Sequence, residues 1–189
     1  MTMVEVVYYV ACSVDGFIAT ADGGVEWLSA VQQEGEDFGY ADFFASIDSM
    51  IMGSRTYEQV CEFGDWPYRD TPCWVLSRRR LAPQARGVTV TDASPTEVLA
   101  DVADRELRRP WLVGGARLAA SFLADGRIAE CIITIIPVLL GSGIPLFADQ
   151  RGRERLQLIG CRQYPAGVVN LPYRVIGGGG QRAPAGPRT

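Results

Sequence analysis

The chain has 189 residues, 48% of them hydrophobic and 21% charged, which predicts one globular domain rather than a disordered or fibrous protein. It contains no histidine and no lysine, which excludes a Ser-His-Asp triad, a Cys-His dyad, a histidine-bound zinc ion and a Schiff-base lysine. The net charge of −4 argues against a nucleic-acid partner, because binding to a phosphate backbone needs a basic face.

Membrane and metal functions also find no support in the sequence. No segment reaches the roughly 18 apolar residues that cross a bilayer, and residues 1–10 lack the basic region of a signal peptide. We therefore expect a cytoplasmic protein without a membrane partner. The five cysteines form no C-x-x-C pair and predict buried free thiols without a metal site; they are Cys12, Cys61, Cys73, Cys131 and Cys161.

The first predicted element is an apolar strand at 5–12, which leads into the turn-rich segment 13–24. Three later runs are apolar on both faces, as in buried parallel strands, and lie at 50–53, 73–77 and 111–115. Helical patterns lie between the strands, at 35–47, 55–63, 95–104 and 117–125. This alternation predicts a three-layer α/β/α fold with a mostly parallel central sheet.

The clearest helix start lies at residue 95. Ser94 is a preferred N-cap residue, Pro95 suits the first helical position, and Glu97 completes a capping box. The pattern predicts a helix over 95–104.

From about residue 128 the pattern changes to three strands, at 129–141, 155–164 and 166–177. The last two are joined by residues 165–167 and predict an antiparallel hairpin at the sheet edge. Residues 1–176 are therefore expected to form a single domain. The Gly/Pro-rich segment 177–189 predicts a flexible tail.

Residues suited to an anion follow one of the buried strands. Gly53 ends the strand, and Ser54, Arg55 and Thr56 open the next helix, so free N–H groups and the helix dipole favour a negative charge there. The hydroxyls and the guanidinium group add donors that suit phosphate. The alternative is that Ser54 only caps the helix and Arg55 is a solvated surface charge.

Two further strand ends carry similar chemistry. Ser77 and Arg78 open the basic run 77–80, and Gly114 and Gly115 precede another helix. Ligands of open α/β sheets bind at the carboxyl ends of the strands, so the three ends predict one crevice for a ligand with several phosphates. The plainer interpretations are an exposed basic run and a tight strand-to-helix turn. Neither G-x-G-x-x-G nor a P-loop motif is present.

Five motifs in chain order resemble the dihydrofolate-reductase-like superfamily, and most closely its RibD C-terminal-domain branch. They are SVDGFIA (13–19), IMGSRTYE (51–58), VLSR (75–78), LVGGARL (112–118) and IIPVLLGSGIPLF (135–147). The likeness covers about residues 4–176, and this branch includes 5-amino-6-(5-phosphoribosylamino)uracil reductases of riboflavin biosynthesis. It implies an antiparallel C-terminal edge strand, NADPH across the carboxyl ends of the strands, and a homodimer.

The resemblance also implies positions for the cofactor. The phosphates would contact Gly53, Ser54, Arg55 and Thr56; the adenosine 2′-phosphate would lie near Ser77 and Arg78; the pyrophosphate would lie on Gly114 and Gly115; and the nicotinamide would contact Ala11 and Ile18. In relatives the Gly-Gly bond tends to be cis. The family usually has a basic residue directly after the first glycine, where this chain has Ser54. Either Arg55 takes that role or Arg78 carries the 2′-phosphate with less help.

The substrate side departs further from the pattern. Dihydrofolate reductases follow a loop tryptophan with a proline and an acid, whereas Trp27 is followed by Gln32 at that spacing and by no proline. Counting back from Gly53 places Asp37 on the first turn of the matching helix, where it could contact the substrate and donate a proton. The alternative is that Asp37 only favours the helix N-terminus in solvent. Trp27 is expected at the edge of the substrate pocket or in the core, and Asp15 is expected to hold its turn.

The sequence thus predicts an NADPH-dependent reductase that transfers a hydride to a small heterocyclic or carbonyl substrate. The alternatives are a dihydrofolate reductase and a non-catalytic nucleotide-binding protein on the same fold. A zinc deaminase half is excluded, because H-x-E and P-C-x-x-C are both missing.

Overall fold

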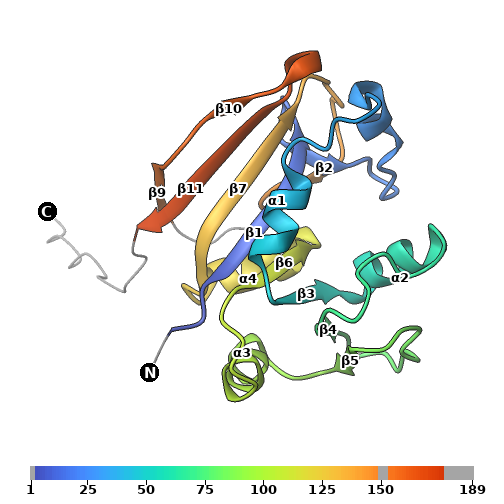
Figure 1. Cartoon of the computed structure of the whole chain (residues 1–189), viewed down its shortest axis with the longest axis vertical. Helices are drawn as coiled ribbons and strands as arrows, with labels where there is room; N and C mark the ends of the chain where they lie inside the picture. Colours follow the sequence, from blue (N-terminus) through green and yellow to red (C-terminus); the bar gives the residue numbers. More distant parts are fainter. Residues whose placement is uncertain (1–2, 149–152, 177–189) are drawn as a thin grey trace, which may run out of the picture.

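A twisted sheet of nine strands forms the centre of the computed structural model, which describes residues 3–148 and 153–176 (Figure 1). The strands run in the order β10-β11-β7-β1-β6-β3-β4-β5, and β9 also pairs with β11. Their bounds are β1 Val6–Ser13, β3 Ser49–Gly53, β4 Cys73–Leu76, β5 Val88–Thr91, β6 Pro110–Gly114, β7 Ile128–Ile136, β9 Arg155–Leu158, β10 Arg162–Gln163 and β11 Val169–Ile176. The strands from β7 to β5 are parallel, and β11 is antiparallel to β7. The predicted mostly parallel sheet with an antiparallel C-terminal edge is confirmed.

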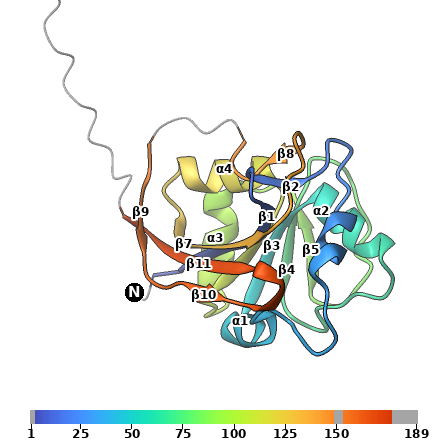
Figure 2. The same ribbon diagram turned by 90° about the horizontal axis from the view of Figure 1, so that it is seen from above.

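Helices cover both faces of the sheet, as predicted. They are α1 Tyr40–Ser46, α2 Ser54–Glu62, α3 Pro95–Asp104 and α4 Ala116–Ala124, with 3-10 turns at Glu26–Val31 and Pro165–Gly167. Figure 2 shows α3 and α4 on one side of the sheet and α1 on the other. A small second sheet pairs β2, Phe17–Ala19, with β8, Ile144–Pro145. No helix among the described residues is both long and apolar enough to cross a membrane.

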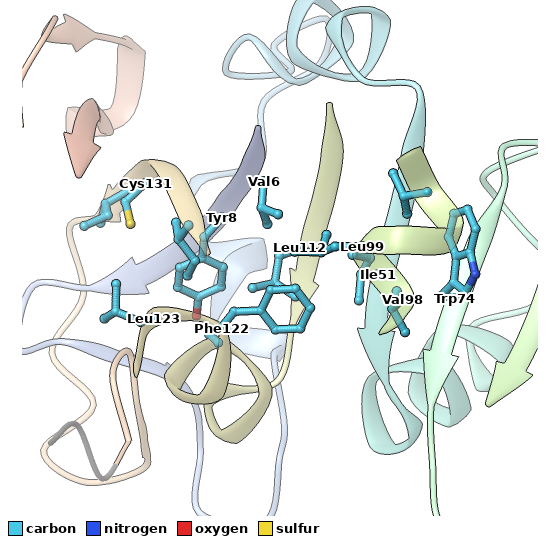
Figure 3. Packing of buried hydrophobic residues seen from close by; sticks show 14 of the residues in the cluster. Val6, Tyr8, Ile51, Trp74, Val98, Leu99, Leu112, Phe122, Leu123 and Cys131 are labelled. Carbon is cyan, nitrogen blue, oxygen red and sulfur yellow. The ribbon is translucent and has the colours of Figure 1, made fainter. Parts of the chain in front are cut away.

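Two hydrophobic clusters fill the two faces of the sheet, because side chains alternate along each strand. In β1, Val6 and Tyr8 face α3 and α4, whereas Val7 faces α1 and α2. Figure 3 shows the first cluster, in which Phe122 of α4 packs against Leu112 of β6. Each fully buried side chain of this size contributes about 1.5–3 kcal/mol to folding. This packing holds α3 and α4 against the sheet and thereby fixes where these two helices begin, at the carboxyl ends of the strands.

Helix α3 has the predicted bounds and the predicted cap. The Ser94 hydroxyl accepts a hydrogen bond from Glu97 N, and Ser94 N donates to Glu97 Oε2 at 2.8 Å. On the other side of the helix, Trp74 Nε1 of β4 donates to Asp101 Oδ2 at 2.7 Å. The capping box and the indole contact together hold α3 against the sheet.

Several other predictions need correction. The helix expected over 35–47 begins only at Tyr40, because Phe38 and Gly39 take left-handed φ angles of 53° and 80°. The strand expected over 155–164 is two short strands, which separate at residues 159–161. The sequence analysis missed β5 and the β2–β8 pair. The predicted tail, 177–189, lies outside the described residues.

The cysteine prediction is also only partly right. Cys12, Cys73 and Cys131 are buried in the core, and Cys61 is half-buried. Cys161 is exposed, because it lies in the connection between the edge strands β9 and β10.

Asp15 ties the turn after β1 to the loop after β7. Its carboxylate accepts hydrogen bonds from the Ser13 hydroxyl at 2.6 Å, from Leu140 N at 3.1 Å and from Gly141 N at 2.7 Å. These bonds, with the Ser13 hydroxyl as the largest cause, lower the pKa of Asp15 below its ordinary value of 3.8. The predicted structural role of this residue agrees with its contacts.

We expect Asp15→Asn to lower the melting temperature at neutral pH, because an amide is a weaker acceptor for these three donors. A lowered folded-state pKa means that the contribution is present above the ordinary pKa and is lost as the pH falls below it. Melting curves of both proteins as a function of pH test this. The difference should shrink below about pH 3.8; a difference that stays constant into strong acid would contradict the role of the charge.

Candidate active site

The three predicted strand ends lie side by side at one edge of the sheet. Met52 of β3 pairs with Gly114 of β6, and Gly53 pairs with Leu76 of β4. The residues that follow these strands therefore lie next to one another at the carboxyl edge of the sheet, where the sequence predicts the crevice.

Two helix N-termini open into this crevice. Helix α2 begins directly after Gly53 and α4 directly after Gly115, and neither helix has a side-chain cap in the described structure. Gly115 N donates a hydrogen bond to Thr56 Oγ1 at 3.1 Å, which ties the two helix starts together. Two helix dipoles and the uncapped N–H groups of both first turns thus favour a negative charge at the same place.

The glycines leave the floor of the crevice open. A Cβ added at Gly53 would meet only Gly114 O, at 3.9 Å, and one at Gly115 would meet only Thr56 Oγ1, at 3.7 Å. Any larger side chain here would fill space that now allows close approach to the backbone. The Gly114–Gly115 bond is trans, which corrects the expectation from relatives. Gly114 makes the turn into α4 with a φ of 154°.

A guanidinium group that the sequence analysis did not single out lies at the start of α2. Arg79 Nη2 lies 3.3 Å from Ser54 Oγ and 2.6 Å from Glu58 Oε2. The Ser77 hydroxyl accepts from Arg79 N at 3.0 Å and donates to Arg79 O at 2.9 Å, which closes a turn that directs Arg79 back over β3. Arg55 and Arg78, the predicted residues, form no ion pair within the described residues.

The Arg79–Glu58 ion pair is weakly held. The two side chains are 59% and 38% exposed, so solvent screens the attraction between their charges. An arriving anion can therefore bind Arg79 at little cost.

The feature of the sequence that could have pointed to Arg79 is Ser77, two residues earlier, because a serine hydroxyl commonly closes such a turn.

The structure brings together two of the four residues predicted at the nicotinamide and substrate end. Ala11 and Trp27 pack in one small cluster with Val31. Ile18 instead packs on the other face of the sheet, because β2 folds back beside β8. Trp27 Nε1 is buried and has no hydrogen-bond partner in the described part of the chain.

The contacts of Asp37 fit the alternative interpretation, in which it favours a helix N-terminus and lies in solvent. Its carboxylate accepts hydrogen bonds from Ala41 N at 2.8 Å and from Gly39 N at 2.9 Å, and these bonds lower its pKa. It is exposed and caps the start of α1. A carboxylate that donors hold ionised is a poor proton donor, so the geometry favours the capping role.

A pocket of about 380 Å³ lies on the α1 side of the sheet, between α1 and the edge strands β10 and β11. Its walls include four aromatic rings and two polar side chains, namely Tyr9, Phe38, Phe43, Tyr164, Arg162 and Asn170. Asn170 Nδ2 donates to Thr134 Oγ1 at 3.0 Å, and Thr134 is 4% exposed. The sequence analysis missed these residues. The feature of the sequence that could have pointed to them is Thr134, a polar residue at an inward position of the largely apolar strand β7.

Comparison with known proteins decides the family. The model of the RibD C-terminal domain matches residues 4–170. The chain belongs to the RibD C-terminal domain family. Uncharacterized protein YwjB of Bacillus subtilis is 37% identical over 170 residues, which cover 89% of this chain and 97% of YwjB. Riboflavin biosynthesis protein RibD of Mycobacterium tuberculosis is 26% identical over 77% of this chain, which spans only 45% of that protein.

Solved structures of two bacterial proteins have the same fold. A protein of Shewanella sp. PV-4, linked by its name to riboflavin biosynthesis, gives a TM-score of 0.82 at 26% identity, over 91% of this chain and 99% of its own. RibD of Acinetobacter baumannii gives 0.74 at 20% identity, over 92% of this chain and 58% of its own, and supports the fold alone. The curated relatives called RibD, from Mycobacterium tuberculosis and Corynebacterium ammoniagenes, are riboflavin biosynthesis proteins by name.

Proposed function

We propose that the chain is an NADPH-dependent reductase that transfers a hydride to a small heterocyclic or carbonyl substrate, similar to 5-amino-6-(5-phosphoribosylamino)uracil reductase. The observation that carries the proposal is the crevice in which Gly115 N and Thr56 Oγ1 join the starts of α2 and α4. Such paired N-termini suit a pyrophosphate. The buried Trp27 Nε1 fits a ligand as well, because an acceptor bound beside Ala11 would satisfy it.

In this reaction the bound NADPH supplies the hydride, and the chain binds, orients and shields the reactants. The first turns of α2 and α4 hold the phosphates in the crevice. The aromatic walls of the pocket beside α1 would pack against a flat ring and shield it from water. The substrate would bind on this sheet face, which also carries Ala11.

Turnover tests the proposal. The purified protein is mixed with NADPH and with pterins, pyrimidines or quinones in turn, and oxidation of the cofactor is followed by its absorbance. Oxidation that depends on one of these classes supports a reductase. Oxidation with dihydrofolate that methotrexate blocks would identify a dihydrofolate reductase instead. NADPH that is bound but never oxidised would favour a non-catalytic nucleotide-binding protein.

Arg79 makes the preference for NADPH testable. We expect Arg79→Gln to weaken NADPH binding about tenfold and to leave NADH binding unchanged, because a charge-assisted bond to the 2′-phosphate is worth about 1.5–3 kcal/mol. Arg78→Gln and Arg55→Gln, compared in the same assay, show which guanidinium dominates. Arg127→Gln removes an exposed charge beyond the end of α4 and serves as the control. Equal losses for both cofactors would refute a contact with the 2′-phosphate.

A further inference from the structure

The Tyr9 side chain lines the pocket between α1 and the edge strands β10 and β11. We infer that Tyr9 donates a hydrogen bond, and then a proton, to the group that is reduced. The inference rests on the proposed reductase and names its proton donor. The ligand class that it implies is a flat ring with an acceptor oxygen or nitrogen.

The Tyr9 ring is held firmly in one position. It stacks on Phe43 of α1 with 4.1 Å between ring centroids and meets Trp111 edge-on at 6.1 Å. Trp111 Nε1 also donates to the Tyr9 carbonyl at 3.1 Å. A ring fixed on two sides can place its hydroxyl with the accuracy that proton transfer needs.

The register of the sheet shows where the Tyr9 side chain lies. Ala11 pairs with Thr134, Thr134 with Asn170, and Asn170 with Arg162, so these four side chains form one row across four strands. Tyr9 lies two residues before Ala11 on the same face of β1, about 7 Å away along the strand. The register thus places the Tyr9 side chain beside this row, on the sheet face that carries the predicted nicotinamide position at Ala11.

A hydrogen bond between neighbouring strands fixes the role of Thr134. Asn170 Nδ2 donates to Thr134 Oγ1, so the single proton of the Thr134 hydroxyl remains free for a neighbouring acceptor such as the Tyr9 oxygen. Thr134 is almost fully buried and has no access to competing water. When Thr134 donates to the Tyr9 oxygen in this way, the proton of Tyr9 is left for an acceptor bound in the pocket.

The surroundings keep Tyr9 protonated. Burial is the largest cause that raises its pKa, the Thr134 hydroxyl partly opposes this rise, and the nearby Tyr164 and Asp37 add to it. The Arg162 guanidinium lies over the Tyr164 ring at 4.8 Å and faces the same region. At neutral pH Tyr9 is thus a neutral donor, whereas Asp37 is an ionised cap.

The step balances in atoms and electrons. A hydride from the dihydronicotinamide forms the new C–H bond at the carbon of a C=N or C=O group. The electron pair of the broken π bond moves to the nitrogen or oxygen, which takes the proton from Tyr9 Oη. The tyrosinate then regains a proton from water, so one hydride and one proton are consumed in each turnover.

Binding of flat rings tests the inference without turnover. Uracil and lumazine are titrated into the protein, and its tryptophan emission, to which Trp111 beside Tyr9 contributes, reports their binding. Tyr9→Phe keeps the ring but removes the donor. We expect this variant to bind both rings about tenfold more weakly, because it loses one hydrogen bond to the ring. Its affinity for NADPH should equal that of the wild type. Thr134→Val, which removes the Thr134 hydroxyl, should show a smaller loss.

Tyr40→Phe is the matched control, because Tyr40 also touches Trp111 but does not line the pocket. It should leave ring binding unchanged. Tyr9→Phe with wild-type affinity for both rings would overturn the inference, as would a wild-type protein that binds NADPH but neither ring. Tyr9-dependent ring binding without any NADPH binding would refute the reductase and, with it, the proton transfer.

Discussion

Gly115→Val is expected to weaken NADPH binding about 100-fold while the protein stays folded. The two added methyl groups would extend from the start of α4 into the crevice, where the backbone now lies open. They would displace a pyrophosphate from one or two charge-assisted hydrogen bonds to backbone N–H groups, each worth about 1.5–3 kcal/mol. Residue 115 has a φ of −38°, so valine imposes no left-handed strain. Titration of tryptophan fluorescence with NADPH measures the loss.

Gly115→Ala is the matched control for this change. Its Cβ meets Thr56 Oγ1 at 3.7 Å, an ordinary contact, and it reaches no further into the crevice. We expect a loss of only a few-fold in NADPH affinity. If Gly115→Val bound NADPH as tightly as Gly115→Ala, the pyrophosphate would have to lie elsewhere.

Phe122→Ala is expected to lower the free energy of unfolding by about 3–5 kcal/mol. The ring is fully buried between α4 and the sheet, in the cluster that contains Tyr8 and Leu112 (Figure 3). Its loss leaves a cavity that the surrounding strands cannot fill. For a domain of this size, the change corresponds to a melting temperature lower by roughly 10 °C. Urea denaturation of the variant and the wild type measures the difference.

Arg117→Ala serves as the control on the same helix, because Arg117 is exposed. It should change the free energy of unfolding by no more than about 0.5 kcal/mol. A loss below about 1 kcal/mol for Phe122→Ala would contradict the packing that holds α4 at the crevice.

Local sequence signals predicted the parts of the fold that local physics determines. The capping box of Ser94 and Glu97 gave α3 its bounds, and the apolar runs marked the buried strands β3, β4 and β6. The crevice followed because parallel strands share one carboxyl edge. Short elements with weak patterns were missed, such as β5 and the β2–β8 pair, since their pairing partners decide whether they form.

Contacts between residues that are far apart in the chain could not be predicted from the sequence. Arg79 reaches Ser54 across 25 positions, and only the Ser77 turn makes this possible. The Tyr9 pocket exists because β11 returns beside β7 and brings Asn170 to Thr134. The role of Asp37 depended on the backbone N–H groups of Gly39, just before α1, and of Ala41 in its first turn, which the spacing from Gly53 could not show.

The most direct test is a titration of the purified protein with NADPH and, separately, with NADH, followed by quenching of its four tryptophans. Saturable binding of both, with NADPH the tighter ligand, is the result expected from the crevice of α2 and α4 and from Arg79 at its edge. Equal affinities would contradict the 2′-phosphate contact, and no binding of either cofactor would contradict the proposed reductase itself.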